Sequence, residues 1–153
     1  MWCLLPMFKK ILVATDASPA SERAVGFAAQ LSVFHEAELL ILNVIRDMQL
    51  PPELREAPEF ESFYNAREDL MRRAADRILD LAKQKAKQAG AKNVQTAIGS
   101  GDPATSVAGF ARRRHVDLIV VGTRGLSKAS AVSMGSVSRK LLDLTDVNCL
   151  VIR

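Results

Sequence analysis

The chain has 153 residues, of which 48% are hydrophobic and 25% charged, and its formal net charge is +4. This length suits one domain with a sizeable core, and the composition is ordinary for a soluble globular protein. A polynucleotide-binding surface needs a clustered basic stripe, whereas the Lys and Arg residues here are scattered among acids, so nucleic acid is not an expected partner.

The N-terminal stretch MWCLLPMFKK is apolar but too short to span a bilayer, and it lacks the pattern of a signal peptide. Residues 1–8 are interpreted as an N-terminal appendage within a single domain, 1–153. Cys3 and Cys149 have no metal-ligand spacing and form no disulfide framework. We therefore expect a cytoplasmic protein that does not associate with membranes.

The first half of the chain alternates apolar runs with helical patterns. A buried strand is predicted at 11–14, and a helix follows it, with Ser18 as N-cap and Pro19 in the first turn. A second apolar strand covers 38–44. The three prolines in 46–58 predict a loop, and a long amphipathic helix is predicted over 59–89. Its apolar stripe is predicted to comprise Phe63, Leu70, Ala74, Ile78, Leu81 and Ala82.

The second half repeats the alternation. A weaker strand at 93–98 is expected near the edge of a sheet, and a helix opens at Pro103 with Asp102 as its cap. A fourth strand at 117–122, a helix at 135–144 and a last strand at 149–152 complete the chain. Strict alternation predicts a parallel sheet covered by helices on both faces, an α/β fold that binds ligands beyond the carboxyl ends of its strands.

Two of those strand ends carry candidate binding groups. Asp16 follows the first strand and is interpreted either as a turn former that bonds nearby amides or as a carboxylate that accepts hydrogen bonds from a ligand. Val44 ends the second strand, where its backbone groups are placed to bind the edge of a flat base. The alternative for Val44 is a plain core residue.

The fourth strand runs into GTRGLSKASAVSMGSVSRK, residues 122–140. Gly122 and Gly125 permit close approach of a ligand to the backbone, and Gly135 with Ser136 introduces a helix whose first amides have no intrahelical partner. Such amides bind anions, and the Ser136 and Ser138 hydroxyls add donors. The segment predicts a phosphate site; the alternative is a loop whose glycines only make turns. Arg124 and Lys128 are candidates to attract the phosphates.

The same segment fits G-x2-G-x9-G-[S/T] and resembles the signature of the ATP-binding branch of the universal stress protein family. The opening KKILVATDASPASERA and the segment GDPATSVAGFARRRHVDLIVVG are similar to that family as well, so the resemblance covers 9–153. It implies a three-layer α/β/α, Rossmann-like fold of the adenine nucleotide alpha hydrolase type, with strand order 3-2-1-4-5. It also implies a homodimer through the last strand and bound ATP with Mg²⁺ or Mn²⁺.

The resemblance also assigns roles to individual positions. It implies that Asp16 lies near the ribose or, through water, near the metal-linked phosphates. The remaining nucleotide-binding positions that it implies are Ala14, Thr15, Val44, Gly122, Gly125, Gly135, Ser136 and Val137. Thr123 and Arg124, which lie between the first two glycines of the loop, are predicted to belong to the same site.

Three functions follow as alternatives. The leading one is a nucleotide-binding regulatory module read by a signalling partner, with AMP or cyclic AMP as alternatives to ATP. The second is an enzyme that hydrolyses ATP or transfers its phosphate, for which only slow turnover is expected because the loop lacks the G-x4-G-K-[S/T] clamp. No catalytic residues are assigned, since His35 and His115 fall at helix ends and no nucleophile has an adjacent base. The third is a nucleotide-free interaction module.

Overall fold

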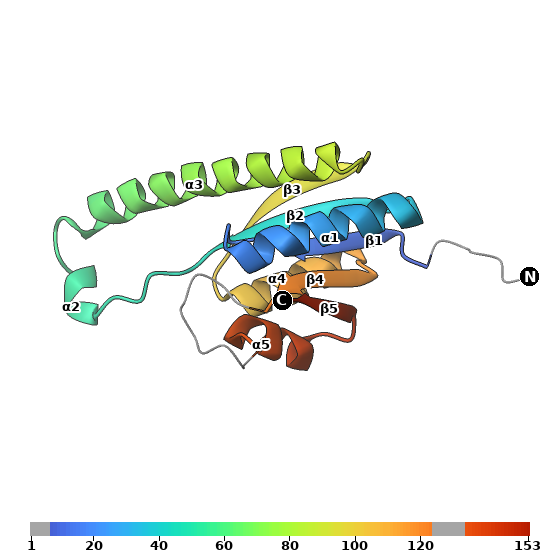
Figure 1. Ribbon diagram of the computed structural model, residues 1–153. Helices are drawn as coiled ribbons and strands as arrows, with labels where there is room; N and C mark the ends of the chain where they lie inside the picture. The colour runs from blue at the N-terminus through green and yellow to red at the C-terminus, as the bar shows by residue number, and fades with distance from the viewer. Residues whose placement is uncertain (1–6, 124–133) are drawn as a thin grey trace, which may run out of the picture.

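The computed structural model describes residues 7–123 and 134–153, and these form an α/β/α sandwich around a parallel sheet (Figure 1). The strand order is β3-β2-β1-β4-β5, as the resemblance implied. The strands are β1 (Lys10–Ala14), β2 (Glu38–Ile45), β3 (Val94–Ser100), β4 (Leu118–Gly122) and β5 (Asn148–Ile152). The helices are α1 (Pro19–His35), α2 (Pro52–Arg55), α3 (Phe60–Gln88), α4 (Pro103–Arg114) and α5 (Ser136–Leu144).

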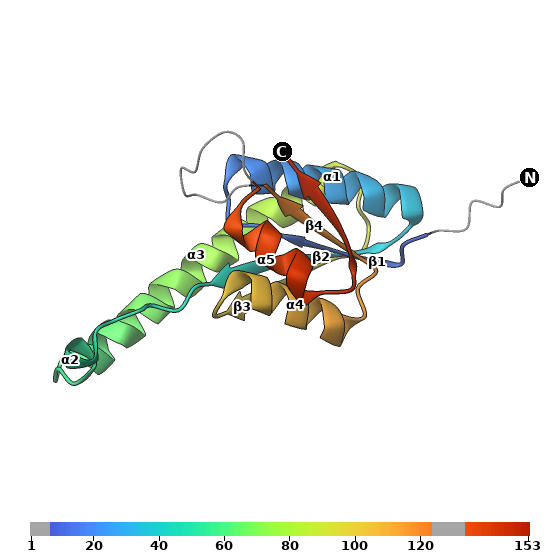
Figure 2. The ribbon, with the colours of Figure 1, turned by 90° about the horizontal axis from the view of Figure 1, so that it is seen from below.

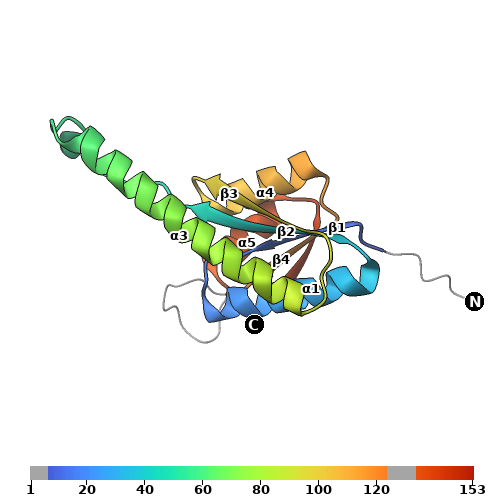
Figure 3. The ribbon, with the colours of Figure 1, turned by 90° about the horizontal axis from the view of Figure 1, so that it is seen from above.

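The sheet is buried on both faces because its central strands are mostly apolar. In β1, Ile11 and Val13 pack toward α1 and α3, whereas Leu12 packs toward α4 and α5. The view from above shows α1 and α3 on one face and α4 behind the other (Figure 3). Strand β3 lies at the edge, as its alternating pattern predicted.

Two helices begin as their sequences predicted. The Ser18 hydroxyl caps α1 by accepting from the Ser21 amide, and Asp102 caps α4 by accepting from the Thr105 amide; a proline follows each cap. Both caps are set by residues within one helical turn, so local sequence is enough to place them.

The predicted loop at 46–58 contains a short helix, α2, which the prediction missed because the segment is rich in proline. Pro52 occupies its first turn, where the missing amide donor costs nothing. Helix α2 and the N-terminal half of α3 project beyond the sheet as an arm (Figures 1 and 3).

The predicted apolar stripe of α3 was largely wrong. The residues that this helix buries are Ala75, Leu79, Ala82 and Ala86. Phe63, Leu70 and Leu81 are instead 56%, 62% and 56% exposed. The helix carries two apolar stripes, and the sheet covers the less hydrophobic of them.

Candidate functional site

The turn after β1 is held by a buried network of hydroxyl groups. The Thr15 and Ser21 hydroxyls lie 3.2 Å apart, and the Ser21 hydroxyl donates to the Ser18 carbonyl at 3.0 Å. Thr15, Ser18 and Ser21 are each buried, and the Thr15 amide donates to Leu42 in the neighbouring strand. Sequence reasoning assigned Thr15 through the resemblance but gave Ser21 no role. The network fixes the backbone from which Asp16 projects.

Asp16 adopts the turn-forming geometry that was one of its two interpretations. Its Oδ1 accepts from the Ser18 amide at 2.9 Å, and the half-buried side chain lies at the carboxyl edge of β1. Ala17 beside it has a φ of 63°, in the left-handed region that a residue with a β-carbon rarely adopts. The Asp16 carboxylate has lone pairs beyond the one that Ser18 uses, so the turn is compatible with a ligand contact.

Asn43 is a polar residue of this edge that sequence reasoning missed. It is 7% exposed inside the apolar run ELLILNVI, and its side-chain amide donates to the Thr15 carbonyl at 2.7 Å. A lone amide in a buried strand was the available signal. Val44, next along β2, is half-buried and packs with the core on the α4 side, and the strand continues to Ile45.

Gly122 ends β4 against the first turn of α1. A β-carbon there would lie 2.8 Å from the Ala20 carbonyl carbon and 2.9 Å from the Ser21 nitrogen. Contacts this short force backbone movement, so packing of β4 on α1 is itself enough to require glycine. The ligand clearance predicted for Gly122 therefore has a competing structural reason.

The next residue joins three elements. The Thr123 amide donates to the Ile152 carbonyl of β5 at 2.7 Å, and the Thr123 carbonyl accepts from the Gly135 amide. The end of β4 and the start of α5 are thus held together although thirteen residues separate them in sequence. Arg124, Gly125 and Lys128 lie outside the described residues.

Helix α5 begins without a side-chain cap among the residues that the structure describes. Gly135 occupies the N-cap position with φ −60° and ψ 156°, which other residues also adopt, and its backbone makes no use of glycine's freedom. Ser136 is exposed at the first helical position, and Val137 packs on the core, so Val137 offers only its amide to the site.

Ser138 does not take the role predicted for it. The side chain is 2% exposed, and its hydroxyl donates to the Gly135 carbonyl at 3.0 Å. A hydroxyl turned back into its own first turn is an ordinary alternative to an outward contact. The hydrogen-bond donors at this helix start that point to no partner in their own turn are therefore the first backbone amides and the Ser136 hydroxyl, if a ligand is to bind there.

Comparisons with known proteins show the family of this chain. The sequence profile of the Universal stress protein family matches residues 7–153. The chain belongs to that family. The universal stress protein YxiE of Bacillus subtilis is 34% identical over 149 residues, which is 96% of this chain and the whole of YxiE.

Several solved structures share the fold. The structure of hypothetical protein MJ0577 superposes with a TM-score of 0.81 at 25% identity, over 95% of this chain and 96% of that one. A universal stress protein solved in complex with cAMP gives 0.68 at 24% identity, over 96% and 98%. An Arabidopsis thaliana family member with AMP bound gives 0.62 at 20% identity, over 94% and 90%.

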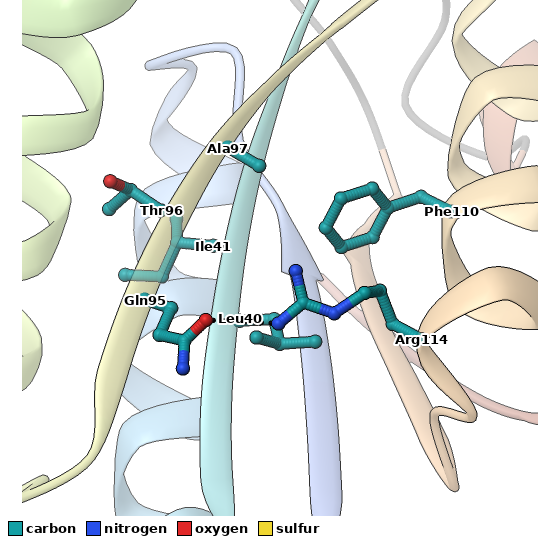
Figure 4. Close-up of a pocket in the computed structure, with 7 residues that line it drawn as sticks. All are labelled: Leu40, Ile41, Gln95, Thr96, Ala97, Phe110 and Arg114. Atoms are coloured by element: carbon teal, nitrogen blue, oxygen red, sulfur yellow. Dashed lines mark hydrogen bonds between the residues drawn. The ribbon is translucent and has the colours of Figure 1, made fainter.

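Two pockets of the structure lie away from the predicted nucleotide site. One, of about 10 Å³, lies where Arg114 donates to the Gln95 side chain and stacks over Phe110 (Figure 4). It has room for about one water and is not a ligand site. The other, of about 510 Å³, is open and polar and lies at the end of β3 and the start of α4. Neither is lined by the predicted site residues.

The start of α4 already holds a carboxylate, whereas the start of α5 has no side-chain cap among the described residues. Asp102 accepts from both the amide and the hydroxyl of Thr105, and Lys140 of α5 lies 3.1 Å from the same carboxylate. The Thr105 hydrogen bonds, followed by Lys140, lower the pKa of Asp102 from 3.8 to about 2. The carboxylate thus stays ionised and occupies the anion position of its own helix.

The described part of the chain contains neither a membrane-spanning helix nor a cluster of metal-binding side chains. No helix within 7–123 or 134–153 is long and apolar enough to cross a membrane. In the same ranges no three His, Cys, Asp or Glu side chains gather as a metal site. Partial burial raises the pKa of the Cys149 thiol, which keeps it protonated at neutral pH.

Proposed function

We propose that this chain is a regulatory module that holds an adenine nucleotide at the carboxyl edge of β1, β2 and β4, with its phosphates at the start of α5. The observation that carries the proposal is the N-terminus of α5, which no side chain of the described residues caps and which the Thr123–Gly135 hydrogen bond holds beside the end of β4. First-turn amides and the positive end of a helix dipole favour an anion there.

The remaining edge supplies the other half of the nucleotide. Ala14 and Thr15 end β1, and Val44 lies near the end of the adjacent β2, so base and ribose have neighbouring strand ends against which to lie. Relatives solved with cAMP and AMP support an adenine nucleotide as the ligand class. Gly122, Thr123, Arg124, Gly125, Ser136 and Val137 are the positions proposed to surround the phosphates.

ATP with Mg²⁺ or Mn²⁺ is the finer form of the proposal. Mg²⁺ is commonly held by one or two carboxylates together with substrate phosphates and water, which does not require a cluster of protein ligands. Asp16 at the edge of β1 is the carboxylate that fits, and it would act through water. The nucleotide itself would supply the other ligands.

Efficient catalysis is not part of the proposal. His35 is the last residue of α1 and His115 caps the C-terminus of α4, so both lie at the opposite edge of the sheet from Asp16 and Gly135. Slow hydrolysis by water beside the bound phosphates is the alternative. Phosphate release at many turnovers per second would favour an enzyme over a module.

The test begins with mass spectrometry of nucleotide released from the purified chain. Calorimetric titration of the stripped protein with ATP, ADP, AMP and cAMP, with and without Mg²⁺, then ranks the ligands. Gly125→Val is expected to abolish binding with circular dichroism unchanged. The proposal fails if every adenine nucleotide binds more weakly than about 1 mM, which corresponds to about −4 kcal/mol.

Assembly through β5 is proposed together with nucleotide binding. In the described sheet β5 pairs with β4 on one side only, and Leu150, Val151 and Ile152 are half-buried. An open edge strand of this kind is a template for pairing with a second copy. Hydrogen exchange of residues 148–152 should slow as protein concentration rises, while the opposite edge, β3, should not change; equal behaviour of both edges would rule the dimer out.

A further inference from the structure

Helix α3 presents a stripe of apolar residues to solvent along its outer face, interrupted by Arg77 between Ala74 and Leu81. The stripe, called here the outer stripe, consists of Phe63, Ala66, Leu70, Ala74 and Leu81, all exposed. Their separations of three, four, four and seven residues place them on one side of a helix. Single exposed apolar residues are ordinary, but a row along five turns marks an interaction surface.

The N-terminal half of this helix has almost no support from its own domain. Every fully buried residue of α3 lies at Ala75 or beyond, and the segment before it projects past the sheet with α2 (Figures 1 and 3). The Arg67 guanidinium donates to the Arg46 carbonyl, which places the β2–α2 connection along another side of the arm. A helical segment of this length is marginal alone in water, because packing supplies most of the stability of a helix.

The charges of α3 are segregated along its length. The cap and first part carry more acids than bases: Glu59, Glu61, Glu68 and Asp69 against Arg67. The later part is basic: Arg72, Arg73, Arg77, Lys83, Lys85 and Lys87 against Asp76 and Asp80. An antiparallel copy of the same helix places the acidic part against the basic part, whereas a parallel copy places like against like.

We propose that the outer stripe binds the outer stripe of a second copy of this chain, antiparallel, about a two-fold axis that crosses near Arg72. A two-fold interface requires a surface complementary to itself, and the reversed charge order of α3 meets that requirement. In this register Leu70 lies against Ala74 of the second copy, so that a large side chain meets a small one. Phe63 lies against Leu81.

The geometry is tested by disulfide trapping in the full chain. In a Cys3→Ser, Cys149→Ala background, Leu70→Cys and Ala74→Cys proteins are mixed and oxidised. The mixed disulfide is expected at least about tenfold faster than for Phe34→Cys, a control on α1 that is 71% exposed. A rate equal to the control overturns the proposal, as does faster self-linking of Phe63→Cys, which would indicate parallel pairing.

A charge exchange tests the same register without cysteines. On one flank of the outer stripe, Asp69 lies opposite Arg77 of the second copy. Asp69→Arg and Arg77→Asp are each expected to weaken association about tenfold in sedimentation velocity, and the double variant to recover it. Additive losses in the double variant contradict the pairing.

Leu70→Ser and Phe34→Ser provide the matched apolar pair. Only Leu70→Ser is expected to weaken association, with circular dichroism confirming that both variants fold. If the stripe binds a basic amphipathic peptide while the chain remains uncross-linked, the occupant is a different partner and self-pairing is wrong. β5 pairing does not confuse the result, because it brings neither position 70 nor position 74 to its counterpart.

Discussion

Helices α4 and α5 begin at the same edge of the sheet, follow parallel strands and pack on the same face, yet their first turns differ (Figure 2). At α4 the protein supplies its own anion, since Asp102 accepts from Thr105 and pairs with Lys140. At α5 the cap position is Gly135, which has no side chain to bond the first amides. The difference indicates which helix start is shaped for the fold and which is available to a ligand.

The largest expected effect comes from making α5 resemble α4. Gly135→Asp places a carboxylate over the first amides, where it competes with and repels phosphate. Two charge-assisted hydrogen bonds of about 1.5–3 kcal/mol each are lost, so nucleotide affinity should fall by two or more decades in calorimetry. Stability should change by only a few tenths of a kcal/mol, because glycine and aspartate are both accepted N-caps.

Gly135→Ala is the matched control for that variant. The backbone at Gly135, with φ −60° and ψ 156°, accepts alanine without strain, and the amides stay bare. Affinity within a few-fold of the parent is expected. If alanine abolishes binding as completely as aspartate does, clearance around Gly135 rather than bare amides decides the site.

Gly122→Ala separates fold from site at the end of β4. The new methyl group would approach Ala20 and Ser21 within 2.8–2.9 Å, so α1 must shift. Overpacking of this kind typically costs about 1–3 kcal/mol, which should appear as a lower urea midpoint with an unchanged m-value. If the variant is as stable as the parent but no longer binds nucleotide, the glycine is required to leave space for the ligand and not for packing on α1.

The sequence was sufficient wherever the physical cause is local. Continuous apolar runs identified the buried strands, and a capping residue followed by proline located the starts of α1 and α4. The weak alternation at 93–98 placed β3 at an edge. Each of these depends on residues within a few positions of one another.

Prediction failed where the cause is tertiary. Helix α3 has two apolar stripes, and only the position of the sheet decides that Leu79 is buried while Leu70 is exposed. The direction of the Ser138 hydroxyl and the contact of Gly122 with α1 likewise depend on packing. Asn43 was readable as an isolated amide in an apolar run, but its partner, the Thr15 carbonyl, becomes visible only in the fold.

The converse change removes the carboxylate from the start of α4. Asp102→Ala removes the cap and the partner of Lys140, and it should lower stability by about 1 kcal/mol in urea unfolding. Nucleotide affinity should stay within about twofold of the parent, because the proposed phosphate site lies at the start of α5. Ser18→Ala, which uncaps α1, is the comparison for the stability loss. A large loss of affinity in Asp102→Ala would mean that the two helix starts act as one site.

The smallest effect concerns the bridge between the two helices. Because the pKa of Asp102 falls from 3.8 to about 2 on folding, the ionised form adds stability that is present above about pH 4 and is lost as the pH drops toward 2. Hydrogen bonds from Thr105 are the larger cause of the lowered pKa. Both members of the Asp102–Lys140 ion pair are about half exposed, so solvent screens that pair.

Lys140→Met should therefore cost no more than about 0.5 kcal/mol at pH 7 and leave most of the acid dependence of stability in place. Asp102→Asn should remove that dependence, as seen in urea unfolding at pH 2, 3, 4 and 7. If Lys140→Met removes the pH dependence of stability as fully as Asp102→Asn does, the ion pair with Lys140 of α5, and not the Thr105 hydrogen bonds, keeps Asp102 ionised.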